Sequence, residues 1–200
     1  MSSVPTSNPQ RKELVVPEGF HAPETLHFED LKAVPFSIEH VNPDLEAINS
    51  NYEFIRRTRG GTWPEGITSL EDNQLDATRH RNEFRDNRAF AYSVYNSQDE
   101  YIGFMYLYPI GERTELTPET IKYDVDMSFW TTESAAQRGY YEKLHSAANQ
   151  WLHDEFPFFK NVYCSNAVIP QHEKTSGGTV ENPGSWVGKT TSQGRDDIAR

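Results

Sequence analysis

Two aspartates separated by one residue, Asp124 and Asp126, are the strongest candidates in this sequence for acid–base chemistry. The residues around them alternate in character, as is typical of a β-strand, so both side chains are expected on the same face. Two carboxylates held close together raise the pKa of one of them, and a raised pKa makes a carboxylate a better proton acceptor near neutral pH. A plainer interpretation is a solvent-facing pair on a half-exposed strand, and the residues alone leave both open.

The next predicted strand, residues 161–167, carries further candidates. Tyr163 and Asn166 are expected to point into a cleft, where Tyr163 is a candidate acid for a leaving group. Cys164 is the single cysteine, and no motif places a histidine beside it, so a buried structural thiol is favoured over a nucleophile. The seven histidines are scattered without metal-ligand spacing, so no metal site is indicated.

Arginines are concentrated in two stretches of the first half of the chain. They predict either a positive patch that attracts a phosphate-bearing cofactor or the solvated faces of two helices, and the second interpretation is favoured. The arginines concerned are Arg56, Arg57, Arg59, Arg79, Arg81, Arg85 and Arg88. The whole chain has 19 Lys+Arg against 30 Asp+Glu and a net charge of −11, which argues against DNA or RNA as its main partner.

The periodicity of the sequence predicts the elements that must position these residues. Apolar residues recur with helical spacing in two early segments, the second of which begins with a Thr-x-x-Glu capping signature. The pattern then changes to strand-like alternation, which predicts a hairpin and a later crossover unit. After β-capable residues 25–38, the expected order is helix 42–59, helix 68–84, strands 90–95 and 101–108, strand 121–130, helix 131–156 and strand 161–167.

The length of 200 residues suits one domain with a real core, and residues 25–170 are expected to form it. Residues 1–24 are rich in Pro and Ser and predict a poorly ordered N-terminal arm, while residues 171–200 predict an irregular C-terminal tail. The lone cysteine, the lack of a signal-peptide pattern and the lack of ~18 consecutive apolar residues predict a soluble, cytoplasmic protein without a membrane partner.

The order of elements resembles that of the GNAT superfamily of N-acetyltransferases, over about residues 25–168. The closest agreement lies in Asp124–Leu144 and Trp151–Phe158. The resemblance implies an α+β, GNAT-like (acyl-CoA N-acyltransferase) fold of three layers, α/β/α, around a mixed and mostly antiparallel central sheet. A full GNAT fold adds a helix and two strands after Ala167, and residues 171–200 lack their alternation, so the fold is expected to be trimmed at the C-terminus.

The resemblance also implies acetyl-CoA as a cosubstrate. In the family a Gln/Arg-x-x-Gly-x-Gly/Ala motif holds the pyrophosphate through backbone N–H groups and a helix N-terminus. The matching positions here carry other residues, namely Ala135, Arg138 and Tyr140. The resemblance implies that the pantetheine arm binds the backbone of the central strand. For the phosphates, it leaves the Arg138 side chain as a cation and nearby backbone N–H groups as donors. The predicted cofactor-binding residues are Met127, Ser128, Phe129, Gln137, Arg138, Gly139 and Asn166.

For catalysis, the resemblance places Asp126 where many family members carry a glutamate that acts through water as a base. Tyr163 would supply the proton to the departing thiolate, although the family's usual tyrosine comes from a later helix that this sequence does not show. The predicted catalytic residues are therefore Asp126 and Tyr163.

Two functions follow from these residues. One is an acetyl-CoA-dependent N-acetyltransferase acting on a small-molecule amine or a peptide N-terminus. The other is a catalytically inactive GNAT-like module for binding or assembly, which the missing glycines favour, and an unrelated α+β binding domain is a third interpretation. The acceptor pocket is expected in residues 109–120 and in the tail, because acceptor pockets lie on variable loops. A homodimer is compatible with the sequence.

Overall fold

The computed structural model describes residues 11–171, and these form a six-stranded mixed sheet with helices on both faces. The strands lie in chain order across the sheet, and all neighbours are antiparallel except β5 and β6, which are parallel. The strands are β1 Leu26–Phe28, β2 Leu31–Pro35, β3 Phe90–Asn96, β4 Tyr101–Tyr108, β5 Val125–Thr131 and β6 Val162–Cys164. The helices are the 3-10 helix η1 Ile38–His40 and the α-helices α1 Val41–Arg59, α2 Leu70–Arg85, α3 Glu133–Gln137 and α4 Tyr140–Glu155.

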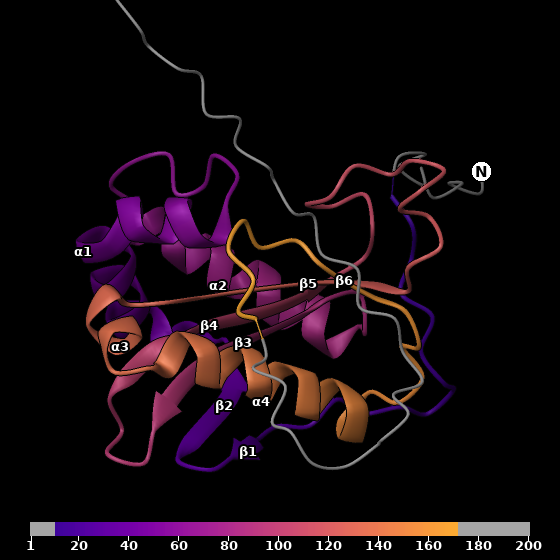
Figure 1. Cartoon of the computed structure of the whole chain (residues 1–200), viewed down its shortest axis with the longest axis horizontal. Coiled ribbons are helices and arrows are strands. Elements are labelled where there is room, and N and C mark those ends of the chain that lie inside the picture. Colours follow the sequence, from indigo (N-terminus) through magenta and orange to yellow (C-terminus); the bar gives the residue numbers. More distant parts are fainter. Residues whose placement is uncertain (1–10, 172–200) are drawn as a thin grey trace, which may run out of the picture.

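The molecule has three layers, and strand β5 lies in the middle one, between β4 and the edge strand β6 (Figure 1). Helices α1 and α2 pack on one face of the sheet, and α4 packs on the other. Met127 and Phe129 belong to the core beneath α4, while Trp130 belongs to the core beneath α1. The predicted α/β/α architecture with a mostly antiparallel sheet is confirmed.

Strand β5 differs from its prediction in length and in burial. It begins at Val125 instead of residue 121, because residues 117–123 form hydrogen-bonded turns. Its alternating pattern predicts one face toward solvent, yet all seven of its residues are buried. Successive residues of β5 point alternately into two hydrophobic cores, because helices cover both faces of the sheet.

Gly103, on β4, leaves no room for a side chain between β4 and β5. A Cβ added to this glycine would lie 2.0 Å from the carbonyl oxygen of Trp130 and 2.7 Å from Cα of Thr131. Gly103 faces Thr131 across the strand pair, so the close approach is built into the register of the sheet. Only a residue without a side chain fits here.

Residues 11–24 pack against the domain, whereas the sequence predicts a poorly ordered arm over residues 1–24. The backbone N–H of Lys12 donates to the carbonyl of Ile110 at 2.8 Å, and the hydroxyl of Tyr92 donates to the carbonyl of Pro23 at 3.0 Å. Phe20 lies edge-on to Phe158, with ring centroids 4.8 Å apart. Phe20 thus holds this stretch on the core together with Leu14, Val16 and Ala22, by burial of apolar area.

Residues 1–10 and 172–200 lie outside the described residues, and so do nearly all of the predicted C-terminal tail and the predicted trimming of the fold. Within residues 11–171, no helix combines the length and the apolar character that a membrane crossing needs.

Candidate functional site

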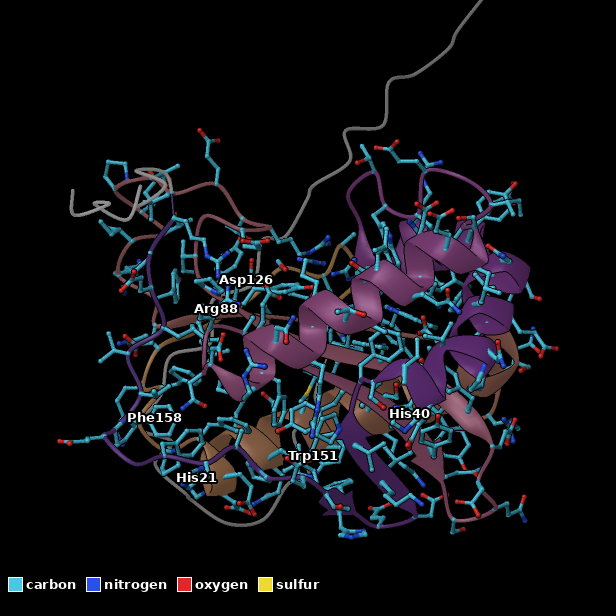
Figure 2. All side chains as sticks on the ribbon, turned by 180° about the vertical axis from the view of Figure 1, so that it is seen from behind. His21, His40, Arg88, Asp126, Trp151 and Phe158 are labelled. Carbon is cyan, nitrogen blue, oxygen red and sulfur yellow. The ribbon has the colours of Figure 1, made fainter. Side chains whose placement is uncertain are left out.

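The parallel pairing of β5 and β6 brings the two predicted catalytic residues side by side. Asp126 and Tyr163 face each other in register, so their side chains project from the same face of the sheet. Tyr163 packs on Tyr123 with ring centroids 5.1 Å apart, at the edge where the loop after β4 leaves the sheet. Figure 2 labels Asp126 at this end of the molecule.

Asp126 is a fully buried carboxylate. It is 0% exposed, and neither of its oxygens has a hydrogen-bond partner among the described residues. Burial raises the pKa of Asp126, whereas the nearby hydroxyls of Ser165 and Thr114 and the positive charge of Arg113 act to lower it. A buried carboxylate without partners is rare in folded proteins and marks a candidate reactive group.

The neighbouring aspartate has no part in this pKa shift. An oxygen of Asp124 accepts a hydrogen bond from the backbone N–H of Asn161 at 2.8 Å, which ties β5 to the start of β6. The interpretation of the two aspartates as a solvent-facing pair is therefore wrong for Asp126. A raised pKa for one carboxylate is also the expectation from the sequence, but its cause is desolvation and not a second carboxylate.

Two arginines that sequence reasoning did not place in the site flank Asp126. Arg59, at the end of α1, is 5% exposed and donates to the hydroxyl of Ser128 at 3.2 and 3.3 Å. Arg113 donates to the hydroxyl of Ser165 at 2.9 Å and to the carbonyls of Arg59 and Gly60 at 2.6 and 3.0 Å. Burial and the charge of Arg59 lower the pKa of Arg113 to about 10, so it stays a cation at neutral pH.

Aromatic rings enclose the arginines on the α1 side. The guanidinium of Arg59 lies 4.3 Å from the ring centroid of Tyr106 and 5.0 Å from that of Trp63. Trp130 donates from its ring N–H to the hydroxyl of Tyr106 at 3.4 Å. The site thus consists of one carboxylate and two guanidinium groups in an apolar surrounding, where electrostatic interactions are stronger than in water.

The remaining arginines do not form the positive patch that the sequence allowed. Five of them each have a carboxylate oxygen within 4 Å, as expected for solvated helix faces, and Arg59 is buried in the site. The paired residues are Arg57, Arg79, Arg81, Arg85 and Arg88. The clustering of these arginines in the sequence therefore does not indicate a phosphate-binding site.

Strands β5 and β6 separate after a short pairing. Beyond that point, the side chain of Asn166 takes the hydrogen bonds that a paired β6 would make to β5. The last backbone bond between them runs from the N–H of Ser165 to the carbonyl of Met127 at 3.0 Å. Beyond it, the amide of Asn166 accepts from the N–H of Phe129 at 3.0 Å and donates to its carbonyl at 2.9 Å. The same amide donates to the hydroxyl of Tyr141 at 2.8 Å.

The predicted pantetheine-binding backbone is thus engaged within this chain. Met127 is bonded to Ser165, and both backbone polar groups of Phe129 are bonded to Asn166. Ser128 pairs in register with Tyr106 on β4. The side chain of Asn166 is 4% exposed, and its predicted role in coenzyme binding stays a prediction.

The segment between β5 and α4 contains the predicted phosphate-binding residues, and all three are exposed. Arg138 ends the short helix α3 and forms a two-point ion pair with Glu100 from the β3–β4 turn, with one contact of 2.9 Å. Gly139 has a φ of 84° and begins α4, and a Cβ there would meet nothing within 4 Å. An exposed glycine therefore precedes the N-terminus of α4, while the cation beside it, Arg138, is already paired with Glu100.

Cys164 is buried, and burial raises the pKa of its thiol to about 11, as expected for a structural cysteine. Within residues 11–171, no three His, Cys, Asp or Glu side chains are grouped as metal ligands would be.

A central sheet whose parallel strands separate, with two helices on one face and a crossover helix on the other, defines a GNAT-like domain. No protein-family model matches the sequence, and no curated protein matches it either. Among solved structures, a putative ribosomal-protein-serine acetyltransferase from Vibrio cholerae aligns with 69% of this chain and 71% of its own, at a TM-score of 0.52 and 9% identity. The ribosomal L7/L12 alpha-N-protein acetyltransferase RimL, in complex with coenzyme A, aligns with 64% of this chain and 67% of its own, at a TM-score of 0.50 and 16% identity. These similarities confirm the predicted GNAT-like fold and make an unrelated α+β domain the wrong interpretation.

Proposed function

We propose that this protein is an acetyl-CoA-dependent N-acetyltransferase that acts on a primary amine, either of a small molecule or at a peptide N-terminus. The observation that carries the proposal is Asp126, a fully buried carboxylate without an ion-pair partner among the described residues, which pairs with Tyr163 on β6 just before β5 and β6 separate. The similar solved structures support it, since both are described as acetyltransferases, one of them only putatively, and the other is in complex with coenzyme A.

The side chains divide the proton transfers between them. Acetyl-CoA, when bound, supplies an acetyl group activated as a thioester. Asp126 accepts a proton from the acceptor ammonium, directly or through water, and its raised pKa suits it to this task at neutral pH. The neutral amine then attacks the thioester carbonyl, a C–N bond forms and the C–S bond breaks. Tyr163, whose pKa is raised by burial and by Asp126, remains protonated and would give its proton to the departing thiolate, and it would regain a proton from the nitrogen that becomes the amide.

The coenzyme fits this chain through backbone groups more than through side-chain cations. The N-terminus of α4 behind the exposed Gly139 suits a pyrophosphate. Arg138 would have to leave Glu100 to contribute its charge, and Gln137 is exposed beside it. Along β5, the pantetheine amides would take the hydrogen bonds that Asn166 makes to Phe129, next to Met127 and Ser128.

Replacing Asn166 with alanine is expected to weaken the fold and strengthen coenzyme binding. The N–H and C=O of Phe129 lose their partners, so the free energy of unfolding should fall by about 1–3 kcal/mol. Acetyl-CoA then no longer competes with a side chain, so its Kd should fall. Urea unfolding and isothermal titration calorimetry measure the two effects, with Gln150→Ala on the exposed face of α4 as the control. A higher Kd would make Asn166 a direct ligand of the coenzyme.

The proposed function is tested by adding acetyl-CoA to the purified protein and following thermal unfolding. At ~100 times its Kd, a ligand of the folded state stabilises it by about 2.7 kcal/mol. For a domain of this size the melting temperature should rise by about 5–10 °C. An unchanged melting temperature at millimolar acetyl-CoA would contradict the proposal.

The second candidate function is an inactive GNAT-like module for binding or assembly. Two observations favour it, namely the ion pair that holds Arg138 and the hydrogen bonds that occupy Phe129. The functions are separated by measuring free thiol in the presence of acetyl-CoA and an amine. Stabilisation by acetyl-CoA without thiol release across a panel of amines would identify the inactive module.

A further inference from the structure

The charged groups around Asp126 also indicate which class of acceptor the site would bind. This inference rests on the proposed function. We propose that the acceptor is a free amino acid, whose ammonium binds Asp126 and whose carboxylate binds the guanidinium groups of Arg113 and Arg59. The acceptor is thus a zwitterion, and polyamines and uncharged amines are poor substrates.

The first argument is the unmet hydrogen-bonding capacity of Asp126. Both of its oxygens are buried, and the groups nearest to them are the hydroxyls of Ser165 and Thr114, while within residues 11–171 no cation is hydrogen-bonded to them. A carboxylate only accepts hydrogen bonds, and an ammonium group is an N–H donor of opposite charge that satisfies it. The amine that is to be acetylated therefore has its binding partner at the base that deprotonates it.

The second argument is an excess of positive charge beside Asp126. Arg113 donates to a hydroxyl and to two backbone carbonyls, and Arg59 donates to the hydroxyl of Ser128. All these acceptors are neutral, and within residues 11–171 no carboxylate forms an ion pair with either arginine. Two guanidinium groups face one carboxylate, and a second carboxylate, from the ligand, would balance them.

The third argument is the proximity of the opposite charges. The hydroxyl of Ser165 lies between Arg113, from which it accepts a hydrogen bond at 2.9 Å, and Asp126, whose pKa it lowers. The two binding groups are thus separated by about the size of one serine side chain. In an α-amino acid, a single carbon carries both the ammonium and the carboxylate, so one small ligand can reach both groups.

The fourth argument is access from solvent. Arg113 and Ser165 are only partly buried, and Gly61 beside them is exposed. A Cβ on Gly61 would lie 3.3 Å from a terminal nitrogen of Arg113, and this glycine has a φ of 81°. A glycine therefore lies against the partly exposed guanidinium of Arg113, where any side chain would contact it.

Matched acceptors test the assignment on the wild-type protein. Thiol release from acetyl-CoA is measured with L-alanine, L-alaninamide, spermidine and an aspartyl peptide amide. L-Alanine should give a kcat/KM at least tenfold above that of L-alaninamide and spermidine. Equal or higher values for the amide or the polyamine would overturn the assignment and leave the acetyltransferase function standing. Preference for the aspartyl peptide would overturn it in favour of an acidic peptide N-terminus. No thiol release with any acceptor would count against the acetyltransferase function itself.

Substitutions of Arg113 give a second, independent test. Arg113→Gln should lower kcat/KM for L-alanine at least tenfold more than it lowers kcat/KM for L-alaninamide, since the amide lacks the carboxylate that Arg113 binds. Arg113→Lys keeps a cation and should fall between the two, which covers the case in which the glutamine variant folds poorly. Arg88→Gln, on an exposed residue paired with Asp86, is the matched control. An equal loss for both acceptors would reduce Arg113 to a structural anchor of α1 and overturn the assignment.

Discussion

Replacing Asp126 with asparagine is expected to lower kcat by about 10²- to 10⁴-fold, because the variant lacks the group that accepts the proton of the acceptor amine. In the wild-type protein kcat/KM should rise with pH through the raised pKa of Asp126, and this acid limb should be absent from the residual activity of the variant. The measurement is the pH profile of thiol release. Asp124→Asn is the matched control, because Asp124 bonds to the backbone of Asn161 and lies outside the site.

The same substitution should leave the fold at least as stable as before. The pKa of Asp126 is raised in the folded state, so the folded protein binds a proton more tightly than the unfolded chain does. Stability is then lost as the pH rises from the ordinary value of 3.8 through the raised pKa, and at pH 7 the ionised carboxylate is a net cost. Asp126→Asn removes this cost, and its melting temperature at pH 7 should equal or exceed that of the wild type. Equal turnover in the variant would remove Asp126 from the mechanism.

Replacing Gly103 with alanine is expected to have the largest effect on stability. The added Cβ would lie 2.0 Å from the carbonyl oxygen of Trp130, which is backbone and cannot rotate away. Strands β4 and β5 would have to move apart at the centre of the sheet, so the free energy of unfolding should fall by about 3 kcal/mol or more. Urea denaturation, or loss of soluble protein on expression, measures the change.

Gly66→Ala is the matched control for this prediction. Gly66 lies in the loop before α2, and a Cβ there would meet nothing within 4 Å. Its effect should stay within about 0.5 kcal/mol. An unchanged denaturation midpoint for Gly103→Ala would mean that β4 and β5 are spaced more widely than the structure has them.

The order of elements could be predicted from the sequence because it depends on local periodicity. The burial of Asp126 could not, because it depends on a second layer of helices. Strand β5 shows the alternation of a half-exposed strand, but Trp130 shares the face of Asp126 and Ser128, and a tryptophan on a supposedly polar face was the available signal for a second core.

The charged residues of the site show a similar limit. Arg59 belongs to an arginine run that favours a solvated helix face, yet its side chain turns onto Tyr106. Arg113 lies in an irregular loop within residues 109–120, where the sequence predicts an acceptor pocket but cannot say which side chain turns inward. Arg138 is paired with Glu100, which lies 38 positions earlier in the chain, so no local sequence pattern could predict this ion pair. The homodimer and the cytoplasmic location stay predictions.

The hydrogen bonds that follow Asn166 make the two halves of the site energetically dependent on each other. Ala167 and Val168 donate backbone N–H groups to the carbonyls of Arg59 and Thr58. A ligand that displaces Asn166 from Phe129 therefore pulls on the end of α1, which carries one of the arginines beside Asp126. Thermodynamic linkage then requires each ligand to change the affinity of the other by the same factor.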